Sequence, residues 1–276
     1  MTVLVVTGTG TGVGKTVVTS AIAALAIAAG RRVAVLKVAQ TGVEAGQPGD
    51  VDEVRRLVGD SVTSRELARY PDPLAPATAA RRAGLPPVTP SSVADAAREL
   101  AAAHDLVLIE GAGGLLVPLD DKGGTLADVA CALAAPVLVV AAAGLGTLNH
   151  TALTAEALRC RGLGCVGIVI GAWPAEPDLA TRCNLTDLPA VTELPLLGAL
   201  REGAGRLTPT EFLTVARQDL GAGWLNGVPI VPGVASAKGG DADGVAEDAG
   251  SSVCSMFGGR NGGVGVVGGA CEEVVV

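Results

Sequence analysis

The chain has 276 residues, which is enough for one domain of good size or for a domain with a tail. Although 49% of the residues are apolar, only 2% are aromatic, so a large core has to be built from valine, leucine, isoleucine and alanine. Such side chains suit a β-sheet that is covered on both faces by alanine-rich helices. The net charge of −8 argues against non-specific nucleic-acid binding, which needs a basic surface. An anionic ligand is still compatible with this charge, because a phosphate site needs only a few local cations and backbone amides.

Neither a secretory signal nor a membrane span is evident in the sequence. Residues 2–6 are apolar, but they are few, lack a cationic flank and lead directly into a glycine-rich loop. The apolar stretch 17–29 is too short to span a bilayer and includes Thr19 and Ser20, so we expect a buried helix there. The six cysteines form no CxxC pair. We therefore expect a cytoplasmic protein with free thiols and with neither membrane nor nucleic acid as a partner.

Short apolar strands alternate with alanine-rich helices along most of the chain. This alternation predicts an α/β fold with a doubly wound, mostly parallel sheet flanked by helices. Ligands of such sheets bind beyond the carboxyl ends of the strands. The expected strands are 3–7, 32–37, 106–110, 137–141 and 164–170, and the expected helices are 16–29, 50–59, 92–103 and 149–161.

The composition changes at about residue 228. Residues 228–276 are rich in glycine and show neither a helical nor an alternating period. We therefore expect one domain, residues 1–227, followed by a low-complexity, disordered tail.

A glycine-rich motif, GTGTGVGKT at residues 8–16, lies between the first strand and the first helix. Its glycines allow backbone N–H groups to face phosphate oxygens, and the helix N-terminus adds a favourable dipole. The strict phosphate-loop spacing would place glycine at Thr9, so this is a variant loop, whereas the dinucleotide-binding spacing GxGxxG does not fit. The fold is therefore expected to be P-loop NTPase-like, with Lys15 at the β- and γ-phosphates and the Thr16 hydroxyl on Mg²⁺. The nucleotide contacts expected from this loop are Gly12, Val13, Gly14, Lys15 and Thr16.

Two carboxylates are candidate partners of that magnesium ion. Magnesium on a nucleoside triphosphate takes one or two protein oxygens, and Asp50 and Glu110 could join Thr16 as ligands. Glu110 ends the expected strand 106–110, and Asp50 follows a glycine-containing loop. The alternatives are that Glu110 is a capping carboxylate and that Asp50 caps a helix, with Asp52 or Glu53 as the ligand instead.

Lys37 ends the second expected strand and is followed by Val38, Ala39, Gln40, Thr41 and Gly42. A lysine at this place can extend its charge to solvent. Because the strand end faces the phosphate loop, we expect Lys37 to act with Lys15 as a catalytic cation that balances phosphate charge.

Together these segments resemble the dethiobiotin synthetases, over about residues 2–227. The resemblance implies an enzyme that converts 7,8-diaminononanoate, CO₂ and ATP, or another nucleoside triphosphate, into dethiobiotin, nucleoside diphosphate and phosphate in biotin biosynthesis. It also implies Mg²⁺ as a cofactor and a homodimer. The matching motifs are GTGTGVGKT (8–16), KVAQTG (37–42), EGAGGLLVPL (110–119) and GLGTLNHTALTAEAL (144–158), of which the last contains the most specific part, GTLNHT.

The resemblance further implies which residues bind the substrates. Thr11 and Thr41 would orient the carbamate and the diamine by hydrogen bonds. The region of residues 146–151 would help to bind the substrate's carboxylate across the subunit interface, because N–H groups at a helix start are free. His150 is expected to be a helix-start residue rather than a base. The contacts of the carboxylate would be Gly146, Thr147 and Asn149. The further contacts of the nucleotide would be Asp50, Glu110, Gly111, Ala112 and Gly113. The base of the nucleotide would lie near Gly171, Ala172, Gly203, Ala204 and Gly205.

Two positions depart from the family pattern. The family usually has proline after the motif lysine, where this chain has Val38. Family members often carry an asparagine that reads the adenine after the strand that ends near Ile170, where this chain has Gly171 and Ala172. The first departure predicts a less rigid loop, and the second leaves the preferred base open.

Three other classes of protein are alternatives. A deviant-Walker partitioning ATPase would carry a lysine where this chain has Gly10, five residues before Lys15. An amidoligase would need a further glutaminase domain, for which residues 228–276 leave no room. A catalytically inactive binding module is disfavoured by the presence of Lys15, Thr16, Lys37 and Glu110.

Overall fold

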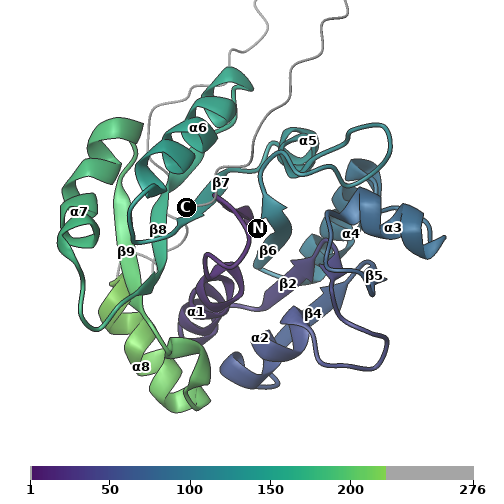
Figure 1. Ribbon diagram of the computed structural model, residues 1–276. Coiled ribbons are helices and arrows are strands. Elements are labelled where there is room, and N and C mark those ends of the chain that lie inside the picture. The colour runs from purple at the N-terminus through teal and green to yellow at the C-terminus, as the bar shows by residue number, and fades with distance from the viewer. Residues whose placement is uncertain (1, 222–276) are drawn as a thin grey trace, which may run out of the picture. The chain divides into compact units, whose positions relative to one another are not determined.

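The computed structural model describes residues 2–221, so the predicted tail, residues 228–276, lies outside the described residues. Seven parallel strands form one sheet in the order β4-β2-β6-β1-β7-β8-β9 (Figure 1). The predicted parallel α/β fold is confirmed. The strands are β1 (Thr2–Gly8), β2 (Val33–Lys37), β4 (Val62–Glu66), β6 (Leu106–Gly114), β7 (Val137–Ala141), β8 (Cys165–Trp173) and β9 (Leu196–Arg201), and β3 (Gln40–Thr41) pairs with β5 (Arg69–Tyr70) in a small parallel sheet of its own.

Helices cover both faces of the sheet. One face carries α1 (Lys15–Ala28), α2 (Asp50–Val58) and α8 (Pro209–Leu220), and the other carries α4 (Pro90–Ala103), α5 (Leu126–Leu133), α6 (Thr147–Cys160) and α7 (Leu179–Thr192). The short α3 (Pro76–Ala83) packs on β5, and the 3₁₀ turn η1 (Ala204–Arg206) follows β9. No described helix is long and apolar enough to cross a membrane.

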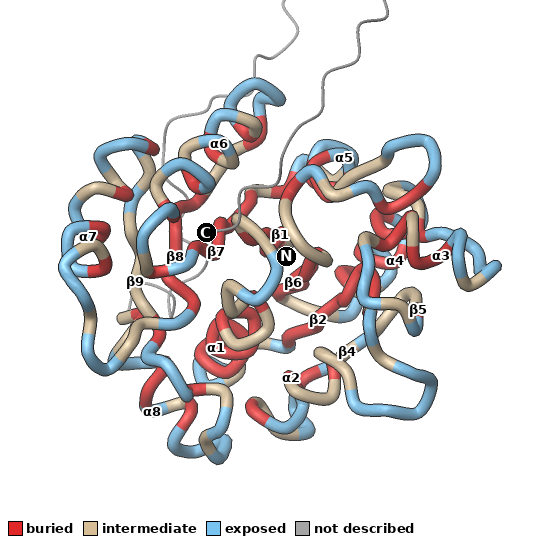
Figure 2. Tube along the Cα trace, viewed as in Figure 1, coloured by how far each residue is buried: buried red, intermediate tan, exposed pale blue. Residues whose placement is uncertain are grey.

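Alternation along the strands builds a separate core on each face. In β1, Leu4 and Val6 pack toward α1, while Val5 packs toward α5, and all three are fully buried. This follows from the two-residue period of a strand, which turns successive side chains to opposite faces. Figure 2 shows the buried residues concentrated in the sheet and on the inner sides of the helices. The sheet is therefore a rigid support for the residues at its carboxyl edge.

Two strands are longer than predicted. Glu110 was expected to end its strand, but β6 continues to Gly114, because Gly114 pairs with Gly8 after a shift of register. Likewise, β8 continues to Trp173, which pairs with Arg201. Gly111, Gly113, Gly171 and Ala172 therefore belong to strand ends rather than to loops.

Candidate active site

The phosphate loop connects the end of β1 to the start of α1. Gly12 and Gly14 have φ of 76° and 93°, backbone conformations that favour glycine. The loop also packs tightly against β8: a Cβ on Gly171 would lie 2.0 Å from the carbonyl oxygen of Val13, and one on Gly14 would lie 2.7 Å from that of Gly171. Gly12 and Gly14 therefore determine the conformation of the loop, and Gly14 and Gly171 allow the loop to pack closely against β8.

Lys15, the first residue of α1, folds back over this loop. Its amine is buried and donates a hydrogen bond to the carbonyl oxygen of Gly10 at 2.9 Å. Burial and the nearby charge of Lys37 lower the pKa of Lys15 to about 8, although Glu110 and Asp50 act in the opposite direction. The amine therefore lies in a place where an anionic ligand would stabilise its charge.

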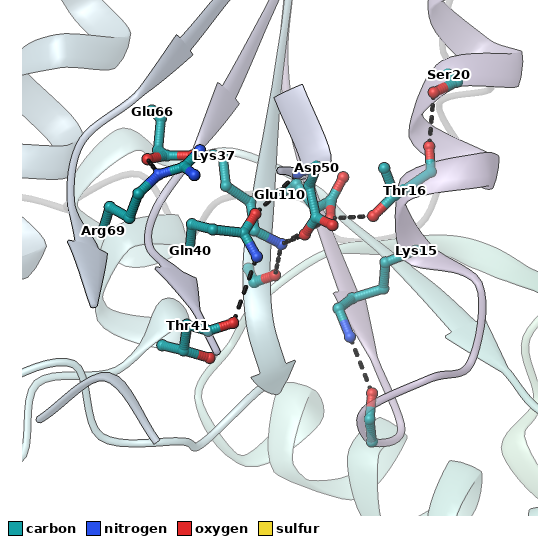
Figure 3. Close-up of polar contacts among 12 residues, drawn as sticks. Lys15, Thr16, Ser20, Lys37, Gln40, Thr41, Asp50, Glu66, Arg69 and Glu110 are labelled. Carbon is teal, nitrogen blue, oxygen red and sulfur yellow. Dashed lines mark hydrogen bonds and ion pairs between the residues drawn. The ribbon is translucent and has the colours of Figure 1, made fainter. Parts of the chain in front are cut away.

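A second lysine is held between two carboxylates. Lys37 and Glu110 are directly paired in the β2–β6 register, and their side chains meet at 2.8 Å. The Lys37 amine also lies 2.5 Å from Asp50 and 3.2 Å from the carbonyl oxygen of Gly111 (Figure 3). Burial lowers the pKa of Lys37, but Glu110 and Asp50 outweigh it and raise the pKa above its ordinary value. Lys37 is therefore a fixed cation rather than one that extends to solvent.

The same Glu110 oxygen accepts a hydrogen bond from the Thr16 hydroxyl at 2.8 Å. Glu110 is 1% exposed and contacts two side chains from two different elements, so it links the phosphate loop to Lys37. This position is not that of a capping carboxylate.

The structure distinguishes the three acidic residues at the start of α2. Asp52 accepts the backbone N–H of Gly49 at 2.8 Å and so caps the helix, and Glu53 forms an ion pair with Arg56 on the same helix. Only Asp50 among these three contacts Lys37. Asp50 is therefore the member of the group that faces the phosphate loop.

These residues surround one cavity of about 740 Å³. Its volume lies within the range of small-molecule sites. Sequence reasoning missed several parts of its wall, among them Gln40 and the segment 73–76. A polar side chain shortly after an apolar strand could have indicated Gln40. The predicted site residues in its lining are Thr11, Gly12, Gly14, Lys15, Thr16, Lys37, Thr41, Asp50, Glu110, Ala112 and Gly113.

The oxygen groups in this cavity fit a magnesium ion that arrives with a nucleotide. Thr16, Asp50 and Glu110 supply one hydroxyl and two carboxylates, the hard ligands that magnesium prefers. Among the described residues, no group of three or more His, Cys, Asp or Glu side chains could hold a metal ion alone. Thr16, Asp50 and Glu110 together therefore offer oxygen groups of the kind that magnesium prefers.

Other predicted residues lie outside the cavity. Gly146 and Asn149 are exposed at the start of α6, and Thr147 is buried beside Thr151, with 3.4 Å between the hydroxyl oxygens. None of these three residues lines the cavity at the phosphate loop. Their neighbour His150 lines a smaller hollow together with Gly8 and Thr9. Gly171, Ala172, Gly203, Ala204 and Gly205 also lie outside its lining.

The predicted base region nevertheless adjoins the phosphate-loop helix. A Cβ on Gly205 would lie 3.3 Å from the Val17 side chain in α1. Arg56 donates hydrogen bonds to the carbonyl oxygens of Gly205 and Leu207, and so holds the turn after β9 against α2. Gly171 is thus close to the phosphate loop, and Gly205 is close to the helix that follows the loop.

The chain resembles known proteins along nearly all of the described residues. The AAA domain family matches residues 2–204. Among solved structures, a ParA family ATPase from Chlorobium tepidum has a TM-score of 0.52 at 14% identity and covers 82% of this chain and 96% of its own. At that identity the likeness shows a shared fold alone.

Proteins called ATP-dependent dethiobiotin synthetase BioD are much more similar. The one from Saccharopolyspora erythraea is 70% identical over 220 residues, which is 80% of this chain and 96% of the relative. Those from Streptomyces avermitilis and Rhodococcus erythropolis are 66% and 58% identical, over 82% and 80% of this chain and 92% and 97% of the relatives. With this identity over nearly the full length of its relatives, the chain belongs to the ATP-dependent dethiobiotin synthetase family.

Proposed function

We propose that the chain catalyses the ATP-dependent formation of dethiobiotin from 7,8-diaminononanoate and CO₂, with release of ADP and phosphate. The observation that carries the proposal is the convergence of Lys15, Lys37, Glu110 and Asp50 on one cavity in a chain of this family. Lys15 and Lys37 supply positive charge to the cavity, which suits catalysis by positioning and charge neutralisation.

The first part of the reaction activates CO₂. One substrate amine attacks the carbon of CO₂ and loses a proton, which gives a carbamate. A carbamate oxygen then attacks the γ-phosphorus of ATP, ADP leaves, and a mixed carbamic–phosphoric anhydride forms. Lys15 and Lys37 stabilise the negative charge on the transferring phosphoryl group and on the carbamate. The Thr11 and Thr41 side chains, both in the cavity wall, orient the carbamate and the diamine.

The second part closes the ring. The remaining amine attacks the carbamate carbon, loses its proton, and expels phosphate. Both reacting groups belong to one bound molecule, so their placement in the cavity supplies much of the rate. A Mg²⁺ ion held by Thr16, Asp50 and Glu110 would neutralise phosphate charge when it is bound with ATP.

We further propose that the active form is a homodimer in which Gly146, Thr147 and Asn149 bind the substrate's carboxylate for the partner subunit. The start of α6 lies outside the cavity of its own chain, as this arrangement requires. Next to it, Leu145, Leu153 and Leu116 are 91%, 56% and 43% exposed, so burying them against a second copy would be favourable.

The base of the nucleotide is assigned to the region of Gly171, Ala172 and the turn of Gly203, Ala204 and Gly205. This region adjoins the phosphate loop and its helix and offers backbone groups rather than an asparagine side chain, so we expect other nucleoside triphosphates to replace ATP in part. We place the enzyme in the cytoplasm, where nucleoside triphosphates are available.

Phosphate release tests this function against the alternatives. We expect 7,8-diaminononanoate with bicarbonate to stimulate release strongly, and DNA to leave it unchanged. If release is independent of the diamine, or if DNA stimulates it, the chain is a switch ATPase and the proposal is wrong. A panel of nucleoside triphosphates in the same assay measures the preference for the base.

A further inference from the structure

Asp50 differs from the other charged residues of the cavity in how it is supported. Lys37 and Glu110 are neighbours in adjacent strands of the central sheet, which fixes both. Asp50 instead follows residues 42–49, most of which are exposed, and its own side chain is 34% exposed. Because the central sheet does not hold it, some other contact has to place its carboxylate 2.5 Å from Lys37.

Gln40 provides that contact. Its side-chain oxygen accepts a hydrogen bond from the backbone N–H of Asp50 at 2.8 Å. Asp50 is the first residue of α2, where a backbone N–H has no acceptor within the helix. Gln40 itself is 7% exposed and is fixed in β3, where its backbone N–H donates to Ala68 at 2.8 Å. The amide therefore ties the start of α2 to a strand.

Gly49, the residue before Asp50, leaves room for this contact because it has no side chain. A Cβ on Gly49 would lie 2.9 Å from the Gln40 side-chain oxygen and 2.8 Å from an Arg69 nitrogen, so glycine allows the close approach. Arg69 also donates to the carbonyl oxygen of Gln47 at 2.5 Å and is itself held by Glu66 at 2.7 Å (Figure 3). The end of the loop is thus held from two sides, by Gln40 and by Arg69.

We propose that Gln40 is a positioning residue that acts through Asp50. By accepting the Asp50 N–H it fixes the first turn of α2, and so keeps the Asp50 carboxylate beside Lys37 and in the cavity. The inference rests on the proposed function, in which Asp50 is a ligand of the magnesium ion. It predicts that loss of the Gln40 acceptor weakens magnesium use without abolishing the fold.

The hydrogen bond itself can be tested without turnover. Gln40→Met keeps the length of the side chain but removes the acceptor, whereas Gln40→Glu keeps an oxygen at the same place. Amide hydrogen exchange should show the Asp50 N–H exchanging about tenfold faster in Gln40→Met and about as slowly as wild type in Gln40→Glu. The matched control is Gln218→Met, because Gln218 lies on α8, accepts a hydrogen bond from Arg201 at the end of β9, and does not line the cavity.

Measurements of turnover then test whether Gln40 positions Asp50 for magnesium use. Gln40→Met should raise the magnesium concentration for half-maximal dethiobiotin formation several-fold and leave the KM for the diamine within about twofold, while Gln218→Met changes neither. Equal Asp50 exchange in wild type and Gln40→Met, or an unchanged magnesium midpoint in Gln40→Met, overturns the inference.

Asp50→Asn and the double variant separate this inference from the proposed function. If Gln40 acts through Asp50, Gln40→Met should add little to the magnesium midpoint of Asp50→Asn, because the two changes remove the same contribution. Additive effects overturn the inference. If Asp50→Asn alone leaves the midpoint unchanged, the assignment of Asp50 as a ligand fails instead, whatever Gln40 does to the exchange rate.

Discussion

At the scale of single residues, the positive charge of Lys15 is unfavourable in its buried place, and a bound nucleotide would stabilise it. Lys15 is buried close to Lys37, and its pKa of about 8 shows the cost of keeping it protonated in this place. Phosphate oxygens beside Lys15 would raise that pKa again. Binding of a nucleotide at pH 8 should therefore take up protons, which calorimetry in buffers of different ionisation enthalpy can measure.

Because Lys15 is buried, we expect Lys15→Met to lose activity and to gain stability. The pKa of Lys15 falls from an ordinary value of 10.5 to about 8 on folding. Below pH 8 both states are protonated and the full penalty is present. Between pH 8 and 10.5 the folded state releases its proton first, and the penalty fades. Lys15→Met should abolish turnover and raise the free energy of unfolding at pH 7, by at most about 3 kcal/mol.

Unfolding curves at pH 7 and at pH 10 check this prediction. The gain in stability of Lys15→Met over wild type should shrink as the pH rises. Normal turnover at saturating ATP would contradict the phosphate-loop assignment, and a gain that grows with pH would contradict the sign of the pKa shift.

Glu110→Gln tests the proposed role of Glu110 as a magnesium ligand. The change keeps an oxygen for Thr16 and Lys37 but removes the charge that a hard cation prefers. The magnesium midpoint for dethiobiotin formation should rise about tenfold or more, because a unit charge beside a cation contributes on the order of 1–4 kcal/mol. The KM for the diamine should change little.

Asp52→Asn is the matched control, since Asp52 caps α2 and does not face Lys37. It should cost at most about 1 kcal/mol of stability and leave the magnesium midpoint where it is. If Glu110→Gln behaves in the same way as this control, Glu110 is a structural residue and the ligand role is wrong.

At the scale of elements, the sequence predicted buried strands well and polar elements poorly. β1, β2 and β7 are continuous apolar runs in the middle of a parallel sheet, so their pattern is unambiguous. β4 is an edge strand with alternating burial, and α7 carries Pro189 inside it, so neither has the apolar period that identifies an element.

The extensions of β6 and β8 were unpredictable for a related reason. Their last residues include glycines, which are poor strand formers, and are held in the sheet by neighbours distant in sequence.

Val38 also differs from its expectation. Its backbone N–H donates a hydrogen bond to the Glu110 carbonyl oxygen at 3.1 Å, a bond that proline could not form. The substitution therefore adds a link between β2 and β6, where a less rigid loop was expected.

The exposed face of α6 allows the proposed homodimer to be tested. Leu153 lines a small hollow of about 230 Å³ together with Leu116 and His150. Leu153→Glu would place a charge in an apolar contact, so light scattering should show a shift from dimer toward monomer. Leu85→Glu is the control, because Leu85 is 46% exposed beyond the end of α3, far along the chain from α6. An undiminished dimer in Leu153→Glu would mean that this face is not the interface.

At the scale of the whole molecule, the sequence placed Lys15, Thr16, Lys37 and Glu110 together because parallel strands end at one edge of a sheet. Asp50 was expected beside them although it follows a loop and begins a helix. The sequence could not separate Asp50 from Asp52 and Glu53, since the choice depends on how one turn of helix faces the cavity. It also missed Gln40, whose contact with Asp50 spans a loop of irregular structure.

The boundary at residue 227 predicts that the last residues are dispensable. The prediction rests on the glycine-rich composition of residues 228–276, which show neither a helical nor an alternating period. A chain that ends at Gly227 should keep its melting temperature within about 2 °C and its turnover within about twofold. Insolubility, or a melting temperature many degrees lower, would show that the fold extends beyond this boundary.

The most direct test of the central claim follows carbon and phosphate together. Purified protein would be given isotope-labelled bicarbonate, ATP, magnesium and 7,8-diaminononanoate, with Lys15→Met as the control. We predict one labelled, acid-stable dethiobiotin for each phosphate released, and neither product with the control or without the diamine. Release of phosphate without label in an acid-stable product would contradict the claim that this site closes the ring.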